Sequence, residues 1–197
     1  MSKRLFDWIL SSLGLLVLGP VLILVALAIK LDSPGPVFFR QERVGRWGHP
    51  FWIHKFRTMR HDPVGQGLQI TVGQDARITR VGAFLRASKI DELPQLIDVW
   101  VGTMSLVGPR PEVPRYVAVY PPELRDKILS VRPGITDIAS IEYRDESAVL
   151  ARAADPEQAY LHEVLPHKLA LSARYVDQAS VWTDLQLILR TLLAIVR

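Results

Sequence analysis

The longest uncharged run of this 197-residue chain lies near the N-terminus and constrains the fold more than any other feature. Residues 8–29 carry no charged side chain, and Asp7 and Lys30 bracket them. As one helix, these 22 residues would reach about 33 Å, which is enough to cross the hydrocarbon core of a bilayer. The run is too long for the apolar part of a signal peptide, and no small-residue cleavage site follows it. A membrane segment is therefore favoured over a buried helix of a soluble domain.

Gly19-Pro20 falls near the middle of this run. A proline inside a helix removes one backbone hydrogen bond and clashes with the preceding turn, so a kink or a break is expected there. Each arm then reaches only about 15–18 Å, half a bilayer. Basic residues flank the run on both sides: Lys3, Arg4, Lys30, Arg40, Arg43 and Arg46. In membrane proteins, basic residues are enriched in the segments that face the cytoplasm. A re-entrant helix–break–helix is slightly favoured, and a kinked spanning helix stays open.

The rest of the chain predicts a mixed α/β, mostly helical domain. The Pro- and Gly-rich residues 32–36 end the membrane segment, so we divide the chain into residues 1–32 and a second domain of residues 33–197. Residues 37–44 and 51–59 are typical of strands around a Gly-rich turn. Residues 75–88, 91–102 and 115–131 favour helices, as does the chain from residue 146 onward, broken near Pro156 and Pro166. Residues 106–114 are expected to form an irregular loop, and residues 132–136 a turn.

Two other features of the chain bear on its class. The C-terminal residues 181–197 are strongly apolar, and they fit equally a helix in the membrane interface or a helix packed on the core. No Gly-rich nucleotide-binding motif occurs, so the fold is expected to be non-Rossmann.

Composition narrows the chemistry. The chain has no cysteine, which excludes thiol catalysis, thiolate metal sites and disulfides. The net charge is +4, and 18 of the 24 basic residues are arginine. Arginine favours bidentate contacts with phosphate, so anionic ligands or lipid headgroups are the expected partners. The basic residues form no run of five, which argues against a nucleic-acid partner.

The candidate reactive group is the neighbouring pair Asp91 and Glu92. They stand at the start of a predicted helix, with Asp91 near the cap and Pro94 in the first turn. The positive end of a helix dipole favours ionised carboxylates, and an ionised aspartate can act as a nucleophile toward phosphorus. Acids are also common at helix starts merely because they stabilise them, and this segment alone favours that simpler interpretation.

Cations elsewhere in the chain shift the balance toward phosphate chemistry. Pro109 and Pro111 fix the backbone on both sides of Arg110, which presents its guanidinium with little entropy to lose. Further candidates for phosphate contacts are Lys55, Arg57, Arg86 and Arg132. Together with the acid pair and a membrane anchor, these residues indicate phosphoryl transfer on a lipid substrate, which usually requires Mg²⁺.

The chain resembles the bacterial sugar transferases, the monotopic polyprenol-phosphate phosphoglycosyl transferases. The resemblance covers the minimal catalytic unit and runs in order through residues 3–10, 37–45, 55–59, 88–112, 132–136 and 184–195. The sequence DELPQL followed by MSLVGPRP is the most specific pairing.

The resemblance implies a two-step reaction at the cytoplasmic face of the inner membrane. Asp91 would attack the β-phosphorus of a UDP-sugar, UMP would leave, and polyprenol phosphate would accept the phospho-sugar. Mg²⁺ would sit against the diphosphate and Asp91, while the role of Glu92 stays open. The resemblance also assigns further roles: Pro109, Arg110 and Pro111 to the nucleotide, and Lys55, Arg86 and Arg144 to phosphates. The N-terminal helix of the family is re-entrant, and the pathway is expected to build a glycoconjugate such as an exopolysaccharide.

Two positions depart from the family pattern. Gly19 stands where many members have serine before the proline, and Asp137 stands where many have glycine. Two other functions stay open, a non-catalytic membrane scaffold of glycan assembly and a UDP-sugar hydrolase. A homo-oligomer is also compatible with the sequence.

Overall fold

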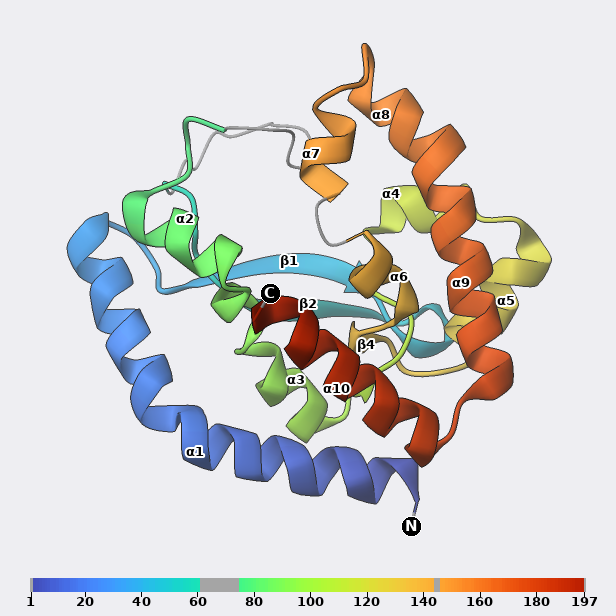
Figure 1. The fold of residues 1–197 in the computed structure, drawn as a ribbon, viewed down its shortest axis with the longest axis horizontal. Coiled ribbons are helices and arrows are strands. Elements are labelled where there is room, and N and C mark those ends of the chain that lie inside the picture. The colour runs from blue at the N-terminus through green and yellow to red at the C-terminus, as the bar shows by residue number, and fades with distance from the viewer. Residues whose placement is uncertain (1, 61–74, 144–145, 197) are drawn as a thin grey trace.

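The computed structural model describes residues 2–60, 75–143 and 146–196, and Figure 1 shows their arrangement. Small sheets and many helices form the body, which confirms the mostly helical α/β expectation. In chain order the elements are α1 (Lys3–Asp32), β1 (Phe38–Val44), η1 (Arg46–Gly48), β2 (Pro50–Phe56), α2 (Arg80–Ala87), η2 (Ile90–Glu92), α3 (Gln95–Val101), β3 (Ser105–Val107), α4 (Pro114–Val117), α5 (Pro122–Leu129), β4 (Gly134–Thr136), α6 (Ile138–Glu142), α7 (Glu146–Leu150), α8 (Pro156–Ala159), η3 (Tyr160–Val164), α9 (Leu165–Gln178) and α10 (Val181–Val196).

Helix α1 is the predicted membrane segment, and it is long and apolar enough to cross a membrane. Only 6% of its most apolar 18-residue window is buried inside the molecule, which argues against a core helix. The helix continues through Pro20 instead of breaking there, and Figure 1 shows it as a bent rod with two arms. The expected helix–break–helix is thus a bend in one helix, because a proline costs the ladder one bond and the flanking turns stay helical. Helix α1 ends at Asp32, as the sequence predicts.

Each arm of α1 rests on a different helix of the body. In the first arm, a side chain at Gly14 would come within 3.2 Å of Leu96 in α3. In the second arm, Ile29 packs with Leu85 of α2 and Phe56 of β2. The remaining apolar surface of α1 is exposed, including Leu16, Val17, Ile23, Leu24, Leu27 and Leu31.

Strands β1 and β2 form the antiparallel hairpin expected from the sequence, with Phe38 opposite Phe56 and Val44 opposite Pro50. The pairing puts Arg43 and Lys55 on one face of the hairpin, since residues two apart along a strand share a face. That face is turned toward the acidic pair described below.

Strands β3 and β4 form a two-stranded parallel sheet, where the sequence predicts a loop and a turn. Ser105 pairs with Gly134, and Val107 pairs with Thr136. A Cβ atom on Gly134 would lie 2.1 Å from the backbone nitrogen of Gly108, so the two backbones approach too closely for side chains. Three-residue strands show too few residues for a period of two to be visible, which explains the wrong prediction.

The helical segments differ from expectation mainly at prolines. Pro121-Pro122 divides the predicted helix of residues 115–131 into α4 and α5. Pro156 starts α8, but Pro166 lies in the first turn of α9 and breaks nothing. The wide π-turns of η3 precede Pro166 directly and relieve the clash of its ring with the preceding turn. Helix α2 begins at Arg80 instead of Asp75, capped by Thr79.

Helix α10 is packed on the core, one of the two alternatives left open for the C-terminal segment. Leu187 packs against Val107 and Tyr175 in the core, so the helix is docked on the body. Trp182, Leu189, Leu192 and Leu193 are exposed on its other side. Contact of that surface with a membrane interface stays a prediction.

Candidate active site

The acidic pair lies on a tight turn instead of a helix start. Lys89 adopts a left-handed conformation (φ 57°), Ile90–Glu92 form one 3₁₀ turn, and α3 begins only at Gln95 with Pro94 as its N-cap. Asp91 is therefore not the cap of α3, which corrects the sequence interpretation. Gly102 (φ 101°) ends α3, as predicted.

Glu92 is held by two cations. Arg110 donates Nη1–H to Oε2 at 3.0 Å and Nη2–H to Oε1, which makes the contact bidentate. Lys55 from β2 donates to Oε1 at 2.8 Å. Burial alone would raise the pKa of Glu92, but Arg110 and Lys55 together hold it well below its ordinary value. The carboxylate of Glu92 is thus ionised and fully engaged.

Asp91 differs from Glu92 both in its hydrogen bonding and in the direction of its pKa shift. Its Oδ1 atom is buried and has no hydrogen-bond partner in the described part of the chain. Burial and the charge of Glu92 raise the pKa of Asp91, against the opposing effect of Lys55, Arg86 and Arg110. A position at a helix start would have favoured the ionised form of this carboxylate, as the sequence predicts. Here the loss of solvation prevails, because the turn places the group inside the body.

The backbone around Arg110 is fixed on three sides. Pro109 accepts a hydrogen bond from Gly134 N–H at 3.0 Å, and Arg110 N–H donates to Asp137 Oδ2 at 3.4 Å. Pro111 accepts a hydrogen bond from Arg43 at 3.0 Å. Asp137 also caps α6 through Ser140 N–H at 2.7 Å, so this departure from the family pattern has a local structural role.

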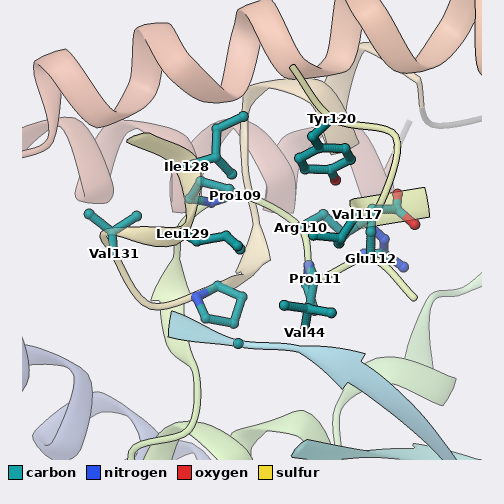
Figure 2. Close-up of a pocket in the computed structure, with 12 residues that line it drawn as sticks. Val44, Pro109, Arg110, Pro111, Glu112, Val117, Tyr120, Ile128, Leu129 and Val131 are labelled. Atoms are coloured by element: carbon teal, nitrogen blue, oxygen red, sulfur yellow. The ribbon is translucent and has the colours of Figure 1, made fainter. Parts of the chain in front are cut away.

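An apolar wall closes the space behind residues 109–111. Figure 2 shows the loop between Val44 of β1 on one side and Ile128 and Leu129 of α5 on the other, with Tyr120 above. The free space there is only about 10 Å³, roughly the room of one water molecule. A larger cavity of about 570 Å³ lies nearby, around Trp47 and Arg125, and no predicted site residue lines it.

A second charged cluster adjoins the loop, and the sequence analysis missed it. Glu112 accepts hydrogen bonds from Tyr160 at 2.6 Å and Lys168 at 3.2 Å, and Arg43 lies 3.6 Å from its other oxygen. Lys168 also donates to Glu146 at 3.0 Å. Glu112, Tyr160 and Lys168 are buried. Only Glu112 had a sequence signal, its place directly after Pro-Arg-Pro, because the partners come from distant helices.

The remaining predicted cations fall in different places. Arg86 lies near Asp91, and its guanidinium donates to Thr58 Oγ1 at 3.3 Å. Arg57 is buried and donates to the carbonyls of Ser33 (2.7 Å) and Pro34, so it ties down the end of α1 and is not part of the acid–cation cluster. Arg132 donates to the Gly102 carbonyl at 2.8 Å, beyond the C-terminal end of α3. Arg144 lies outside the described residues.

The acidic side chains at this site suit a metal ion that takes some of its ligands from a substrate. No group of three histidine or acidic side chains that could hold a metal ion occurs among the residues the structure describes. Asp91 nevertheless offers a buried carboxylate oxygen without a partner. Mg²⁺ commonly binds one or two carboxylates together with substrate phosphates, so these residues fit a magnesium ion that arrives with a diphosphate.

Comparisons with known proteins agree with this arrangement. A profile of the family described as Bacterial sugar transferase matches residues 1–197. The UDP-glucose:undecaprenyl-phosphate glucose-1-phosphate transferase of Xanthomonas campestris pv. campestris is 37% identical over 199 residues, which cover 96% of this chain and 38% of that protein. The protein of the same name from Caulobacter vibrioides is 38% identical over 203 residues, covering 97% and 68%. The exopolysaccharide production protein PSS of Rhizobium leguminosarum bv. phaseoli is 54% identical over 109 residues, covering 55% and 54%.

A long, exposed apolar helix beside a compact body defines a membrane-associated protein of mixed α/β fold. The chain belongs to the bacterial sugar transferase family, as the resemblance predicted. It spans less than two thirds of the length of several of its curated relatives, including the Xanthomonas protein.

Proposed function

We propose that the chain is an enzyme that transfers a sugar 1-phosphate from a UDP-sugar to a polyprenol phosphate and releases UMP. The observation that carries this proposal is the difference in contacts between the two acids of the pair. Arg110 and Lys55 engage Glu92, whereas Asp91 keeps a buried oxygen without a partner. A structural pair of acids gains nothing from such an unsatisfied group, because burying it costs free energy.

The names of the relatives support the substrate classes. The Xanthomonas relative is named for transfer of glucose 1-phosphate from UDP-glucose to undecaprenyl phosphate. An Aeromonas hydrophila relative, 35% identical over 192 residues, is named for N-acetylgalactosamine phosphate and the same lipid. We extend to this chain the shared chemistry, a UDP-sugar donor and a polyprenol phosphate acceptor, in a pathway of glycoconjugates such as exopolysaccharides.

In the proposed first step, a carboxylate oxygen of Asp91 attacks the β-phosphorus of the donor. The bond from that phosphorus to the bridging oxygen breaks, and UMP leaves with the electron pair. In the second step, a phosphate oxygen of the polyprenol phosphate attacks the same phosphorus. The bond to Asp91 breaks, which regenerates the carboxylate and gives the polyprenol-diphosphate sugar.

The surroundings of Asp91 suit this role. Burial deprives the carboxylate of water, which raises its pKa and makes it more reactive than a solvated carboxylate. Lys55 and Arg86 are near enough to Asp91 to lower its pKa, so they are placed to neutralise phosphate oxygens as well. Glu92 then acts as the residue that holds Lys55 and Arg110 in position. Mg²⁺ held between Asp91 and the diphosphate would supply further neutralisation of charge.

We also propose that α1 is re-entrant at the cytoplasmic face of the inner membrane. Both ends of the helix are bound to the same body. At its start, Lys3 donates to the Val107 carbonyl at 3.0 Å, and beyond its end Arg57 donates to Ser33 O at 2.7 Å. A helix that crossed the bilayer would carry one of these ends to the opposite side.

The decisive experiment measures UMP release from a set of UDP-sugars, with and without polyprenol phosphate. The proposal expects sustained release only with the lipid, and about one UMP per enzyme without it. In the latter sample, labelled sugar phosphate should remain on residues 88–95. Sustained release without lipid would instead identify a UDP-sugar hydrolase, and no release under either condition would favour a scaffold. Kinetics that require a ternary complex would contradict the covalent intermediate.

A further inference from the structure

The first two turns of α1 carry polar side chains that point into the catalytic body. Lys3 donates to Val107 O at 3.0 Å, to Tyr175 OH at 3.1 Å and to the buried carboxylate of Asp184. An ammonium group has three N–H donors, so these three contacts use all of them. Lys3 thus joins the start of α1 to β3, α9 and α10.

Two neighbours of Lys3 extend this contact along the backbone between the acidic pair and Arg110. Arg4 donates to the carbonyls of Val99 (2.5 Å) and Trp100 (2.7 Å) at the end of α3. The buried Asp7 accepts a hydrogen bond from Leu106 N–H at 3.1 Å. We call Lys3, Arg4 and Asp7 the α1 clamp.

The clamp adds hydrogen bonds to a sheet that is too small to be stable by itself. Strand β3 has three residues and, among the residues the structure describes, pairs only with β4. The bonds between them include Ser105 N–H to Pro133 O at 2.8 Å and Gly108 N–H to Thr136 O at 3.0 Å. A two-stranded sheet of this size is marginal by itself. The clamp binds Leu106 N–H, a group that would otherwise need another strand or water. It also adds a second donor to Val107 O, which accepts a hydrogen bond from the Tyr175 hydroxyl at 3.1 Å as well.

Strand β3 leads directly into Pro109 and Arg110. Gly108 is the single residue between the end of the strand and this loop. A displacement of Val107 therefore moves the backbone that presents the Arg110 guanidinium to Glu92. The clamp is far from Arg110 in sequence but one strand away from it in the fold.

We propose that the α1 clamp positions Arg110 for the nucleotide part of the donor, with Lys3 as its principal positioning residue. The inference rests on the proposed function and on the contact with the nucleotide that the family resemblance implies for Arg110. It gives the start of the membrane helix a role in donor binding that is separate from anchoring. Lys3 and Lys30 both flank the apolar run as basic residues, but of the two only Lys3 belongs to the clamp.

The test compares Lys3→Met with Lys30→Met in full-length protein held in nanodiscs. Lys30 is exposed at the other end of α1 and has no hydrogen bond or ion pair among the described residues, so it is the matched control. We expect Lys3→Met to weaken binding of UMP by about tenfold or more, measured by calorimetry, and Lys30→Met to leave it unchanged. Unchanged UMP affinity in folded Lys3→Met would overturn the proposal, as would an equal loss in both variants.

A second comparison separates positioning from general stability. In an Arg110→Ala background, Lys3→Met should not weaken UMP binding further, because coupled residues are not additive. A full additional loss in that background would show that Lys3 acts only through stability and would refute the clamp. If Lys3→Met does not fold, Tyr175→Phe removes one of its three acceptors, and a smaller loss of UMP affinity with the same dependence on Arg110 is expected. An unchanged UMP affinity in Tyr175→Phe would then overturn the proposal.

Amide hydrogen exchange tests the clamp without any ligand. In Lys3→Met, the amides of residues 105–108 and of Arg110 should exchange about tenfold faster than in the wild type, while those of β1 and β2 keep their rates. If the wild type does not bind UMP at all, the proposed function fails but this measurement still decides the clamp. Unchanged exchange at residues 105–108 and Arg110 would exclude it.

Discussion

The guanidinium of Arg110 bonds both carboxylate oxygens of Glu92, a residue eighteen positions earlier in the chain. Lys55 adds a second cation to the same carboxylate at 2.8 Å. Glu92 therefore acts as a link between the hairpin, the acidic turn and the Pro-Arg-Pro loop. In contrast, Oδ1 of the neighbouring Asp91 has no hydrogen-bond partner among the described residues. Two adjacent acids of similar chemistry therefore differ in whether they are free to contact a substrate.

We expect Asp91→Asn to abolish turnover and leave the fold intact. The amide cannot act as the nucleophile, and loss of a nucleophile typically lowers kcat by about 10³-fold or more. Because burial raises the pKa of Asp91, the charged form is disfavoured in the folded protein, and the neutral amide should keep or increase the melting temperature. UMP release and thermal unfolding measure the two effects. Appreciable UMP release by a folded Asp91→Asn protein would remove Asp91 from the mechanism.

Glu92→Gln is the matched comparison, since it changes the adjacent acid in the same way. It leaves Lys55 and Arg110 facing each other without their shared anion, so it should destabilise the protein by about 3–5 kcal/mol. Chemical denaturation measures this change. Equal stabilities of the two variants would contradict the division of roles between Asp91 and Glu92.

Arg110→Ala should weaken use of the donor more than use of the lipid acceptor. The loop that carries this guanidinium is fixed by Gly134 and Asp137, which suits a constant contact with an anion or nucleotide. Truncating a buried charge contact costs on the order of 2–5 kcal/mol, so kcat/KM for the UDP-sugar should fall by at least about 30-fold. Arg110→Lys keeps the charge, loses the bidentate geometry and should fall between the wild type and alanine. A rise confined to the KM of polyprenol phosphate would assign Arg110 to the other substrate.

Lys168→Met should destabilise the protein by about 3–5 kcal/mol, because it leaves the buried Glu112 without its closest cation. Lys127→Met is the control. Lys127 pairs with Asp177 at 2.7 Å on the surface, where such pairs contribute about 0–1 kcal/mol. Denaturation curves of both variants test the difference, and similar losses would show that the Glu112 cluster is not a buried network.

The same cluster predicts how stability depends on pH. Burial would raise the pKa of Glu112, but Lys168 and Arg43 hold it below the ordinary 4.5, so its contribution is lost as pH falls through the lowered pKa. Burial would lower the pKa of Lys168, but Glu112 and Glu146 raise it above 10.5, so its contribution is lost as pH rises through the raised pKa. Between these limits the cluster should contribute a constant amount. The stability difference between wild type and Lys168→Met should then be flat from about pH 5 to 10 and shrink outside that range.

Sequence reasoning located the parts of the fold that depend on local pattern. Periodicity or turn residues in the local sequence reveal the apolar run, the hairpin of β1 and β2 and the end of α3 at Gly102. The pair β3 and β4 could not be seen, since each strand has three residues and a close contact between Gly108 and Gly134 defines them.

The candidate site shows the same limit. The sequence named Asp91, Glu92, Lys55 and Arg110, and the structure brings all four together. The sequence could not show that Arg57 binds the end of α1, because nothing in the residues around Arg57 distinguishes it from Lys55. The partners of Glu112 and of the α1 clamp were also invisible, since they lie many residues away and meet only in the folded chain.

The final prediction concerns the path of α1 through the membrane. Its two ends bind one body through Lys3 and Arg57, and its exposed apolar arms are each about half a bilayer long. Single cysteines at Ser2 and Pro36, both exposed, can be introduced into this cysteine-free chain. An impermeant thiol reagent should label both from the same face of sealed vesicles. The geometry would hold the site at headgroup level, where a polyprenol phosphate presents its charge while its tail stays in hydrocarbon.

Pro20→Ala tests what sets the bend. Restoring the missing backbone hydrogen bond should straighten α1, which pulls one of its bound ends away from the body and lowers activity in that fraction of molecules. Gly19→Ala is the matched control, because no atom lies within 4 Å of the position its Cβ would take and the proline remains. Labelling of positions 2 and 36 from opposite faces in the wild type would establish a spanning helix and end the re-entrant proposal. If Pro20→Ala changes neither labelling nor activity, the contacts of Lys3 and Arg57 hold the bend, and the proline is not its cause.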